Sequence, residues 1–145
     1  GGDFMFYHEG VTPAVGNLME AFDNERAAIG AGLGLFVEKS PEKGMRQGFQ
    51  DYVEKDYAKN YGTSPGFAGI KAQSSLDHRY YTEDLGCTMI FWIELAERIG
   101  VDVPAMKSLV TIVSLMMNRD FRAECPRSLA SLGLGDYTKE DPLNF

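Results

Sequence analysis

Functional side-chain types are concentrated in one segment, residues 77–84, with the sequence Asp-His-Arg-Tyr-Tyr-Thr-Glu-Asp. The guanidinium group of Arg79 is planar and can bind a carboxylate through two parallel hydrogen bonds. The carboxylate of Asp84 can accept a hydrogen bond from an imidazole and stabilise its charged form during acid–base catalysis. The segment therefore contains groups suited to recognising a carboxylate and to supporting a histidine.

The neighbours of these two residues add candidate contacts, but they also allow a structural interpretation. His78 and Tyr80 adjoin Arg79, so both are candidate contacts for a bound substrate. Residues 82–84, Thr-Glu-Asp, are types that cap a helix or favour its positive N-terminal end. On spacing alone, the capping of a helix explains this segment better than a binding site does.

Metal chemistry has little support in the sequence. The histidines, His8 and His78, have no spaced partner of the HExxH kind, and a lone histidine is more often structural or solvated. Cys87 and Cys125 are far apart, without a CxxC motif or a nearby histidine pair. We therefore expect no metal site and two free thiols.

A nucleotide site is not expected in this chain either. Gly30–Gly34 reads Gly-Ala-Gly-Leu-Gly, whereas the dinucleotide-binding fingerprint is G-x-G-x-x-G between a strand and a helix. Here the glycines follow a predicted helix. We interpret them as small residues at a close packing point or at a frayed helix end.

Composition and charge favour an ordinary globular domain. The chain has 145 residues, a formal net charge of −7 and scattered basic residues, which argues against binding nucleic acid or anionic lipid. Its apolar stretches are too short for a membrane span, and with free thiols this predicts a cytoplasmic protein. Because the chain starts at Gly1-Gly2 without an initiator methionine, we expect it to be cut from a longer polypeptide.

Helix start and stop signals divide the chain into helices and the segments that connect them. Proline follows a residue that can begin a helix at Pro13, Pro41 and Pro104, and Gly100 supplies a C-terminal stop. The predicted helices cover 13–34, 41–59, a segment capped by Thr82 or Asp84 that ends before Gly100, 104–118, and a short segment between Cys125-Pro126 and Gly133. Residues 62–76 are predicted to form a loop, and 136–145 have no predicted element.

Apolar residues at helical spacing predict the faces that point into the core. In the first helix they are Val15, Leu18, Met19, Phe22, Ile29 and Leu33; in the helix before Gly100, Leu85, Met89, Trp92, Ile93 and Ala96; in the next, Met106, Leu109, Val110, Val113 and Met117. Leu115 and Met116-Met117 are interpreted as core residues rather than a soft binding surface. With no pair of alternating strands visible, we predict an all-α bundle of about five to seven helices.

Several motifs, in order along the chain, resemble the C-terminal domain of the octopine and nopaline dehydrogenases, collectively opine dehydrogenases. Arg79 to Asp84 resembles that family's Arg-Tyr-Leu-Thr-Glu-Asp strip and follows a similar Gly-Ile-Lys-Ala segment. The other matching segments are Phe6–Pro13, similar to Tyr-x-Glu-Gly-(Ile/Val)-Thr-Pro, Glu20–Arg26, Arg98–Val101 and Arg127–Leu134. The resemblance covers most of the chain. Tyr81 replaces an aliphatic residue, and Leu85-Gly86 replaces Val-Pro, which implies a differently shaped pocket floor.

The resemblance implies a helical substrate-binding domain over residues 1–145, like the C-terminal domain of 6-phosphogluconate dehydrogenase, with a Rossmann domain upstream. It implies that the full-length enzyme uses NAD or NADP to join an amino acid and a 2-oxo acid reductively, through an imine. The domain alone would bind no cofactor and be inactive. A homodimer through the long helices is a further expectation.

By position, the resemblance gives roles to two residues. Arg79 would bind a substrate carboxylate, and Asp84 would hydrogen-bond the catalytic histidine. In the family that histidine lies in a His-Pro segment upstream of the first long helix, and neither His8 nor His78 falls on its position.

Two alternatives remain open at this point. One is a non-catalytic helical module for interaction or ligand binding, in which residues 79–84 only begin a helix. The other is the helical domain of a ketopantoate reductase-like dehydrogenase, which would place a catalytic lysine on a helix. Lys71 and Lys107 are available for that role, but neither has a supporting motif around it.

Overall fold

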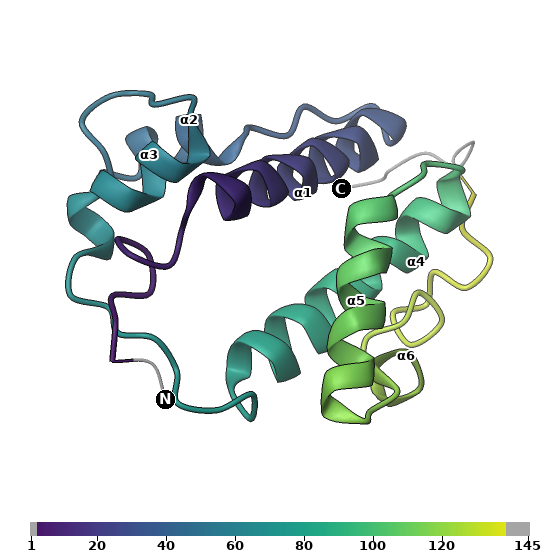
Figure 1. Ribbon diagram of the computed structural model, residues 1–145. Coiled ribbons are helices and arrows are strands. Elements are labelled where there is room, and N and C mark those ends of the chain that lie inside the picture. Colours follow the sequence, from purple (N-terminus) through teal and green to yellow (C-terminus); the bar gives the residue numbers. More distant parts are fainter. Residues whose placement is uncertain (1–2, 139–145) are drawn as a thin grey trace. The chain divides into compact units, whose positions relative to one another are not determined.

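The computed structural model describes residues 3–138, in which every regular element is helical (Figure 1). The elements in chain order are α1 (Pro13–Gly32), α2 (Ser40–Arg46), α3 (Tyr57–Thr63), the 3-10 helix η1 (Pro65–Phe67), the π-helix η2 (Tyr80–Met89), α4 (Ile90–Ile99), α5 (Pro104–Met117) and α6 (Phe121–Glu124). Extended pairing within the described residues is limited to one isolated bridge between Met5 and Lys71. The prediction of an all-α fold is confirmed.

The described residues form two compact units. The first unit contains residues 3–27 and 37–75, and the second contains residues 28–36 and 76–138. Helix α1 therefore contributes its first part to one unit and its last turns to the other. Between residues 3 and 138, no helix is both long and apolar enough to cross a bilayer. The assignment of residues 1–145 to one functional domain stays a prediction.

In the first unit, α1 begins at its predicted position and packs closely on α3. The hydroxyl of Thr12 accepts a hydrogen bond from the Val15 backbone (3.3 Å), as an N-cap residue does. A Cβ atom at Gly16 would lie 2.7 Å from the Ala58 backbone nitrogen, so only glycine permits this approach of the two helices. The close contact places α3 directly beside the start of α1.

The predicted core face of α1 is partly wrong. Val15 and Leu18 are exposed (38% and 44%), whereas Gly16 and Asp23 are buried. The face of α1 that packs in the first unit uses a small residue and a polar residue. Apolar periodicity cannot identify such a face, although Ile29 is buried as predicted.

The predicted helix over 41–59 is also wrong, because the chain divides it into α2 and α3. Gly48 has a φ of +80°, a left-handed conformation that ends a helix. Gln50 is buried and its side chain donates to the Asn60 carbonyl (2.5 Å). The Asp56 side chain then caps α3 by accepting from its backbone (3.1 Å). These local polar contacts outweigh the near-helical spacing of the apolar residues in this segment, which are Met45, Phe49, Tyr52 and Val53.

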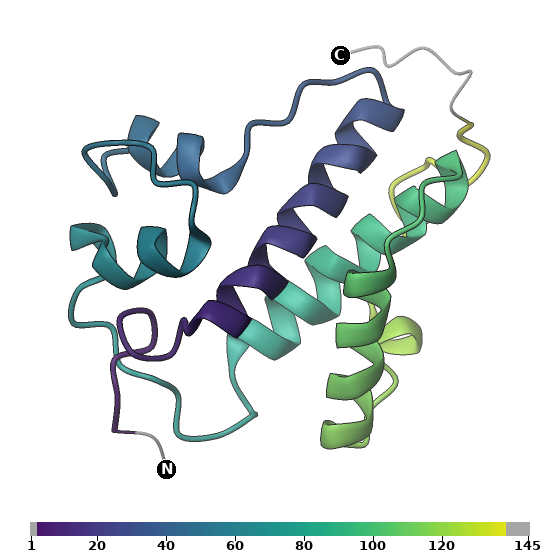
Figure 2. The same ribbon diagram turned by 45° about the horizontal axis from the view of Figure 1, so that its top comes forward.

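The second unit is built on a continuous rod formed by η2 and α4, with α5 beside it (Figures 1 and 2). Its fully buried side chains include Ile93, Met106, Phe121 and Leu129. The predicted inward faces of α4 and α5 are confirmed at their most buried positions. Leu115 and Met116 are exposed (77% and 59%), so their interpretation as core residues is wrong.

The ends of α4 and α1 in this unit match the sequence signals. Gly100 has a φ of +74° and closes α4 as predicted. Gly32 lies where an added Cβ would be 2.9 Å from Val101 and 3.0 Å from Ile99. The glycine-rich segment of α1 is therefore a close packing point at the end of a helix, as expected.

Two boundaries in the second unit differ from prediction. Neither Thr82 nor Asp84 caps the helix before Gly100, because helical backbone already begins at Arg79. The short helix predicted before Gly133 is only a turn. Ser128 and Ser131 exchange side-chain to backbone hydrogen bonds as at a helix start, but Gly133, with a φ of +74°, ends the segment after one turn.

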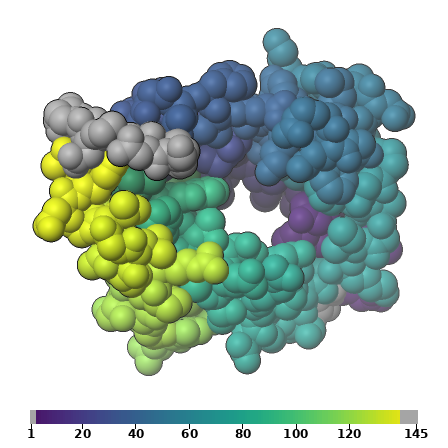
Figure 3. Space-filling model, turned by 180° about the vertical axis from the view of Figure 1, so that it is seen from behind, coloured from purple at the N-terminus to yellow at the C-terminus, as the bar shows by residue number. Residues whose placement is uncertain are grey.

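The short helix of this region lies earlier, at α6, where Asp120 accepts from the Ala123 backbone (3.0 Å). The space-filling view shows the yellow segment that follows α6 packed directly against the teal-green surface of α4 (Figure 3). Glu94 on α4 fixes part of this segment by accepting from the Leu129 backbone (2.9 Å). Of the predicted tail, residues 139–145 lie outside the described residues.

Stability should depend strongly on the α4 core position Ile93, which is 0% exposed. Ile93→Ala should lower the free energy of unfolding by about 2–5 kcal/mol, because it removes buried methyl groups and leaves a cavity. Ile112→Ala is the matched control, since Ile112 is 54% exposed on α5 and should cost less than about 1 kcal/mol. Urea unfolding measures both values, and equal losses would contradict this core assignment.

Candidate functional site

The segment that contains Arg79 and Asp84 forms the start of the η2–α4 rod. Arg79 is in the right-handed helical region (φ −54°, ψ −29°) and directly precedes the π-helix. A π-helix has hydrogen bonds between residues five apart and occurs frequently at functional sites. The segment thus has an unusual backbone where its functional side chains are concentrated.

The side chain of Arg79 is available to solvent. It is 65% exposed, and its Nη2 lies 3.3 Å from Oε1 of Glu83, one helical turn away. An exposed ion pair of this kind stabilises a protein little, because both partners are well hydrated when separated. An anionic ligand could therefore compete with Glu83 for the guanidinium group.

Asp84 is also exposed, and among residues 3–138 its carboxylate has no hydrogen-bond or ion-pair partner. Asp84 does not cap the helix, so the interpretation of this residue as a helix cap is not supported. A carboxylate in this state can accept a hydrogen bond from an incoming donor such as an imidazole N–H.

The two histidines have structural contacts within their own units. The Nε2 atom of His8 lies 2.9 Å from the Ser64 carbonyl in the first unit. In the second unit the Tyr80 backbone donates to His78 Nδ1 (3.3 Å), and the two rings pack edge to face with their centroids 4.6 Å apart. His78 and Tyr80 thus form a pair next to Arg79, while their contact with a substrate stays a prediction.

The thiols of Cys87 and Cys125 are not joined by a disulfide, and both have carbonyl groups as their sulfur contacts. Within the described part of the chain, no group of three histidine, cysteine or carboxylate side chains is arranged to hold a metal ion.

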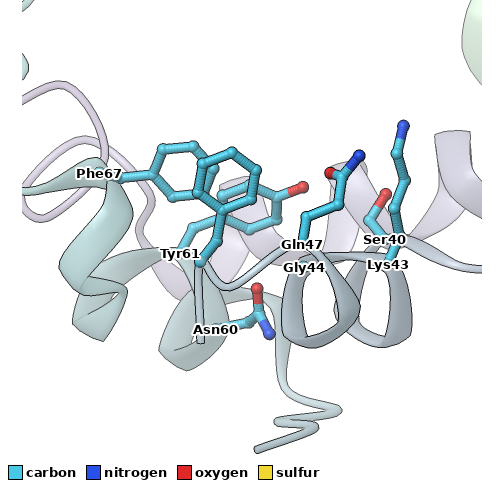
Figure 4. A pocket seen from close by; sticks show the side chains of 8 residues that line it. Ser40, Lys43, Gly44, Gln47, Asn60, Tyr61 and Phe67 are labelled. Carbon is cyan, nitrogen blue, oxygen red and sulfur yellow. The ribbon is translucent and has the colours of Figure 1, made fainter. Parts of the chain in front are cut away.

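A small open pocket of about 130 Å³ lies in the first unit (Figure 4). One wall is the polar face of α2, with Ser40, Lys43 and Gln47. The opposite wall is aromatic, with the rings of Tyr61 and Phe67 stacked at 5.3 Å. Sequence reasoning missed this pocket, because its aromatic residues come from separate segments without a common motif.

Ser40, which lines this pocket, also donates a backbone hydrogen bond to the buried carboxylate of Asp23. Asp23 is 5% exposed and accepts from the Tyr57 hydroxyl (2.5 Å), the Ser40 backbone (2.6 Å) and the Arg26 guanidinium (2.9 Å). Burial alone would raise the pKa of Asp23, but these hydrogen bonds outweigh it and hold the pKa below its ordinary value. Burial and the Asp23 charge together raise the pKa of Tyr57.

Perturbed pKa values often mark functional sites, but the Asp23 network fits a structural role better. Its carboxylate oxygens are filled by donors of the chain itself, which join α1 to the start of α2 and to α3. The sequence contained Asp23 and Arg26 within a matching motif, but nothing in it indicated the contact with Tyr57.

The Asp23 network predicts an acid-sensitive first unit. Because folding lowers the pKa of Asp23 below 3.8, its contribution to stability is present above about pH 4 and is lost as the pH falls through the lowered pKa. Asp23→Asn should therefore lower stability at pH 7 and flatten the decline between pH 4 and pH 2. Asp102→Asn, at a side chain that is 81% exposed, is the control. Parallel acid declines in wild type and Asp23→Asn, measured by urea unfolding, would exclude this role.

Most of the chain, including the Arg79 region, is similar in sequence to known proteins. Residues 1–117 match the family described as NAD/NADP octopine/nopaline dehydrogenase, alpha-helical domain. Vitopine synthase of Allorhizobium ampelinum is 36% identical over 143 residues, which cover 96% of this chain and 38% of that protein. Opine dehydrogenase of an Arthrobacter species is 32% identical over 145 residues, covering 95% of this chain and 38% of that protein.

A solved structure of octopine dehydrogenase with NADH and L-arginine has a similar fold. The TM-score is 0.67 at 20% sequence identity, over 81% of this chain and 33% of that one. The chain thus spans little more than a third of the length of the curated relatives it matches. The structural similarity supports the helical fold, and the functions of the longer relatives remain properties of those proteins.

Proposed function

This chain belongs to the family of the alpha-helical domain of NAD/NADP octopine/nopaline dehydrogenases, and from this membership we propose that it is the substrate-binding domain of an opine dehydrogenase. In such an enzyme an amino acid and a 2-oxo acid condense to an imine with loss of water, and reduction of the C=N bond by NADH or NADPH gives the opine. Gly30–Gly34 close a helix and do not fit a dinucleotide, so the cofactor would be held by a domain outside this sequence. We expect the isolated chain to have no turnover.

The observation that supports this proposal most is the state of Arg79 and Asp84. Both are exposed side chains at the start of one helical rod, and neither is committed to a buried structural contact. Structural ion pairs and caps would hold such residues in fixed contacts. Exposed Arg and Asp side chains are common, and Arg127 and Asp102 are exposed as well. We assign a ligand to Arg79 and Asp84 because their accessible side chains also occupy the positions of the matching family strip.

Arg79 is proposed to bind the carboxylate of the amino-acid substrate. Its planar fork can donate two parallel hydrogen bonds to a carboxylate, whereas the present contact with Glu83 is a single exposed one. The similar octopine dehydrogenase structure contains L-arginine, so an amino acid with a free carboxylate is a ligand known for that relative. The His78–Tyr80 ring pair beside Arg79 would contact the same substrate.

Asp84 is proposed to act as a positioning residue for the acid–base histidine of the complete enzyme. That histidine is expected from the family resemblance and lies outside this sequence. By accepting its N–H, the carboxylate would fix the tautomer of the imidazole and stabilise the imidazolium. The histidine could then give a proton to, or take one from, the reacting nitrogen or oxygen of the substrate.

These roles predict different kinetic effects in the full-length parent. Arg79→Ala should mainly raise the KM for the amino acid, by about 10²-fold, because charge-assisted hydrogen bonds to the substrate are lost. Asp84→Asn should mainly lower kcat, by about 10–10³-fold, because the histidine is less well oriented. NAD(P)H oxidation with a panel of amino acids and pyruvate measures both effects.

The matched controls are Arg127→Ala and Asp102→Asn, at exposed positions of the same unit. Both should leave the kinetics within about twofold of wild type, since neither side chain belongs to the proposed site. If Arg79→Ala and Asp84→Asn are equally silent, the proposed roles are wrong.

Glu83 is an internal competitor of the substrate in this proposal. Since its carboxylate pairs with Arg79, a bound substrate carboxylate must displace it. Glu83→Gln should lower the KM for the amino acid by up to about fivefold, the factor that corresponds to an exposed ion pair. The difference from wild type should shrink at high salt, because salt screens exposed charges.

Glu124→Gln is the control for Glu83→Gln, because it removes another exposed ion pair of the second unit, with Arg119. It should leave KM unchanged at every salt concentration. A KM that rises in Glu83→Gln would mean that Glu83 itself contacts the substrate.

A further inference from the structure

We infer that the π-helical backbone of η2 is what brings Arg79 and Asp84 to one face of the helix, and that Gly86, packed against Phe121, is the residue that positions them. The inference rests on the proposed function, because it concerns how the two proposed site residues are held together. It adds two residues, Gly86 and Phe121, whose side-chain sizes would determine the geometry of the site.

The spacing of the two residues is the first step. In an α-helix each residue turns the chain by about 100°, so residues five apart point about 140° away from each other. Arg79 and Asp84 would then lie on different sides of the rod. In a π-helix the hydrogen bonds join residues five apart, so such residues take the neighbouring positions that residues four apart have in an α-helix.

Two contacts and one close approach at η2 fit the wider turn. The backbone N–H of Ile90, the residue after η2, bonds the carbonyl of Leu85, five residues earlier, as well as that of Cys87. The Cys87 thiol lies 3.7 Å from the carbonyl of Thr82, again five residues earlier. A Cβ atom on Gly86 would lie 3.3 Å from the carbonyl of Tyr81, with the same separation.

The spacing of buried residues along the rod also changes where the π-helix η2 gives way to the α-helix α4. The buried side chains of Leu85, in η2, and Ile90, the first residue of α4, are five residues apart, and Gly86 is buried next to Leu85. In α4 the buried positions Ile93, Ala96 and Ile99 follow at intervals of three. On the exposed side, Arg79 is followed by the exposed pair at positions 83 and 84. Arg79 and Asp84 are thus both exposed at the five-residue interval of a π-helix, and Glu83, one position earlier, is exposed as well.

Gly86 is the point at which η2 meets α6. It is buried, and a Cβ atom there would lie 3.0 Å from Cδ1 of Phe121. Phe121 is 1% exposed, so its ring has little room to move away. Alanine is also a stronger former of ordinary α-helix than glycine. A methyl group at position 86 would thus press η2 away from α6 and disfavour the wide turn.

The π-helical turns would hold Arg79 and Asp84 in a fixed position relative to each other. A substrate carboxylate on Arg79 and a histidine on Asp84 would meet at the same side of the rod only while η2 keeps its π-helical turns. Gly86 contacts neither the substrate nor the histidine in this scheme. It acts through the backbone, as a positioning residue, and its effect should therefore reach both KM and kcat.

Gly86→Ala in the full-length parent tests the inference. We expect a rise in KM for the amino acid and a fall in kcat, each by about fivefold or more, since both site residues turn away from each other. Gly62→Ala is the matched control: Gly62 is also helical, and a Cβ there meets nothing within 4 Å. It should leave both constants within about twofold of wild type.

A double-mutant cycle separates positioning from simple damage to the fold. In an Asp84→Asn background, Gly86→Ala should lower kcat by less than about twofold, because the group it misplaces is already absent. A purely structural effect would lower kcat by the same factor in both backgrounds, and that result would overturn the inference.

A second variant covers the case in which Gly86→Ala folds poorly. In Gly86→Ala/Phe121→Leu the smaller side chain makes room for the new methyl group, so KM and kcat should return towards wild type. Kinetics that stay impaired in this folded double variant would also overturn the inference. If Arg79→Ala and Asp84→Asn are themselves silent, the proposed function fails; if they act and the Gly86 results do not follow, only the positioning role fails.

Discussion

The carboxylate of Asp23 is the charged group on which the first unit is assembled. Three segments of the chain donate to it, from α1, from the start of α2 and from α3. A buried charge is costly unless it is fully hydrogen-bonded, so each donor depends on the others being in place. The same requirement explains why Gly16 must let α3 approach α1: without that approach Tyr57 would not reach its acceptor.

The second unit uses apolar packing and leaves its charged residues at the surface. Phe121 and Ile93 are enclosed almost completely, and the segment after α6 is fastened to α4 by Glu94. The η2–α4 rod is thereby supported along one side, while Arg79 and Asp84 stay on the exposed side. Such a division suits a binding domain, because packing fixes the backbone and leaves the polar side chains free to meet a partner.

The sequence predicts the fold class, the C-terminal end of α4, the bounds of α5 and the buried faces of those helices, because proline, glycine and apolar spacing act locally there. It fails at α2 and α3, where Gly48 and the buried amide of Gln50 interrupt a helical pattern. It also fails on α1, where a glycine and an aspartate form the packed face. The candidate residues Arg79 and Asp84 come from their side-chain chemistry together with the motif resemblance, and no spacing rule for ordinary helices would have paired them.

That last point extends to how helical sequences are interpreted. Polar residues five apart are normally assigned to separate sides of a helix and judged unrelated. At the π-helix, Leu85 and Ile90, the first residue of α4, are buried and five residues apart, and the exposed residues Arg79 and Asp84 have the same interval. A wider helical turn can therefore bring polar residues five apart to neighbouring positions that an analysis with ordinary helical periodicity would separate.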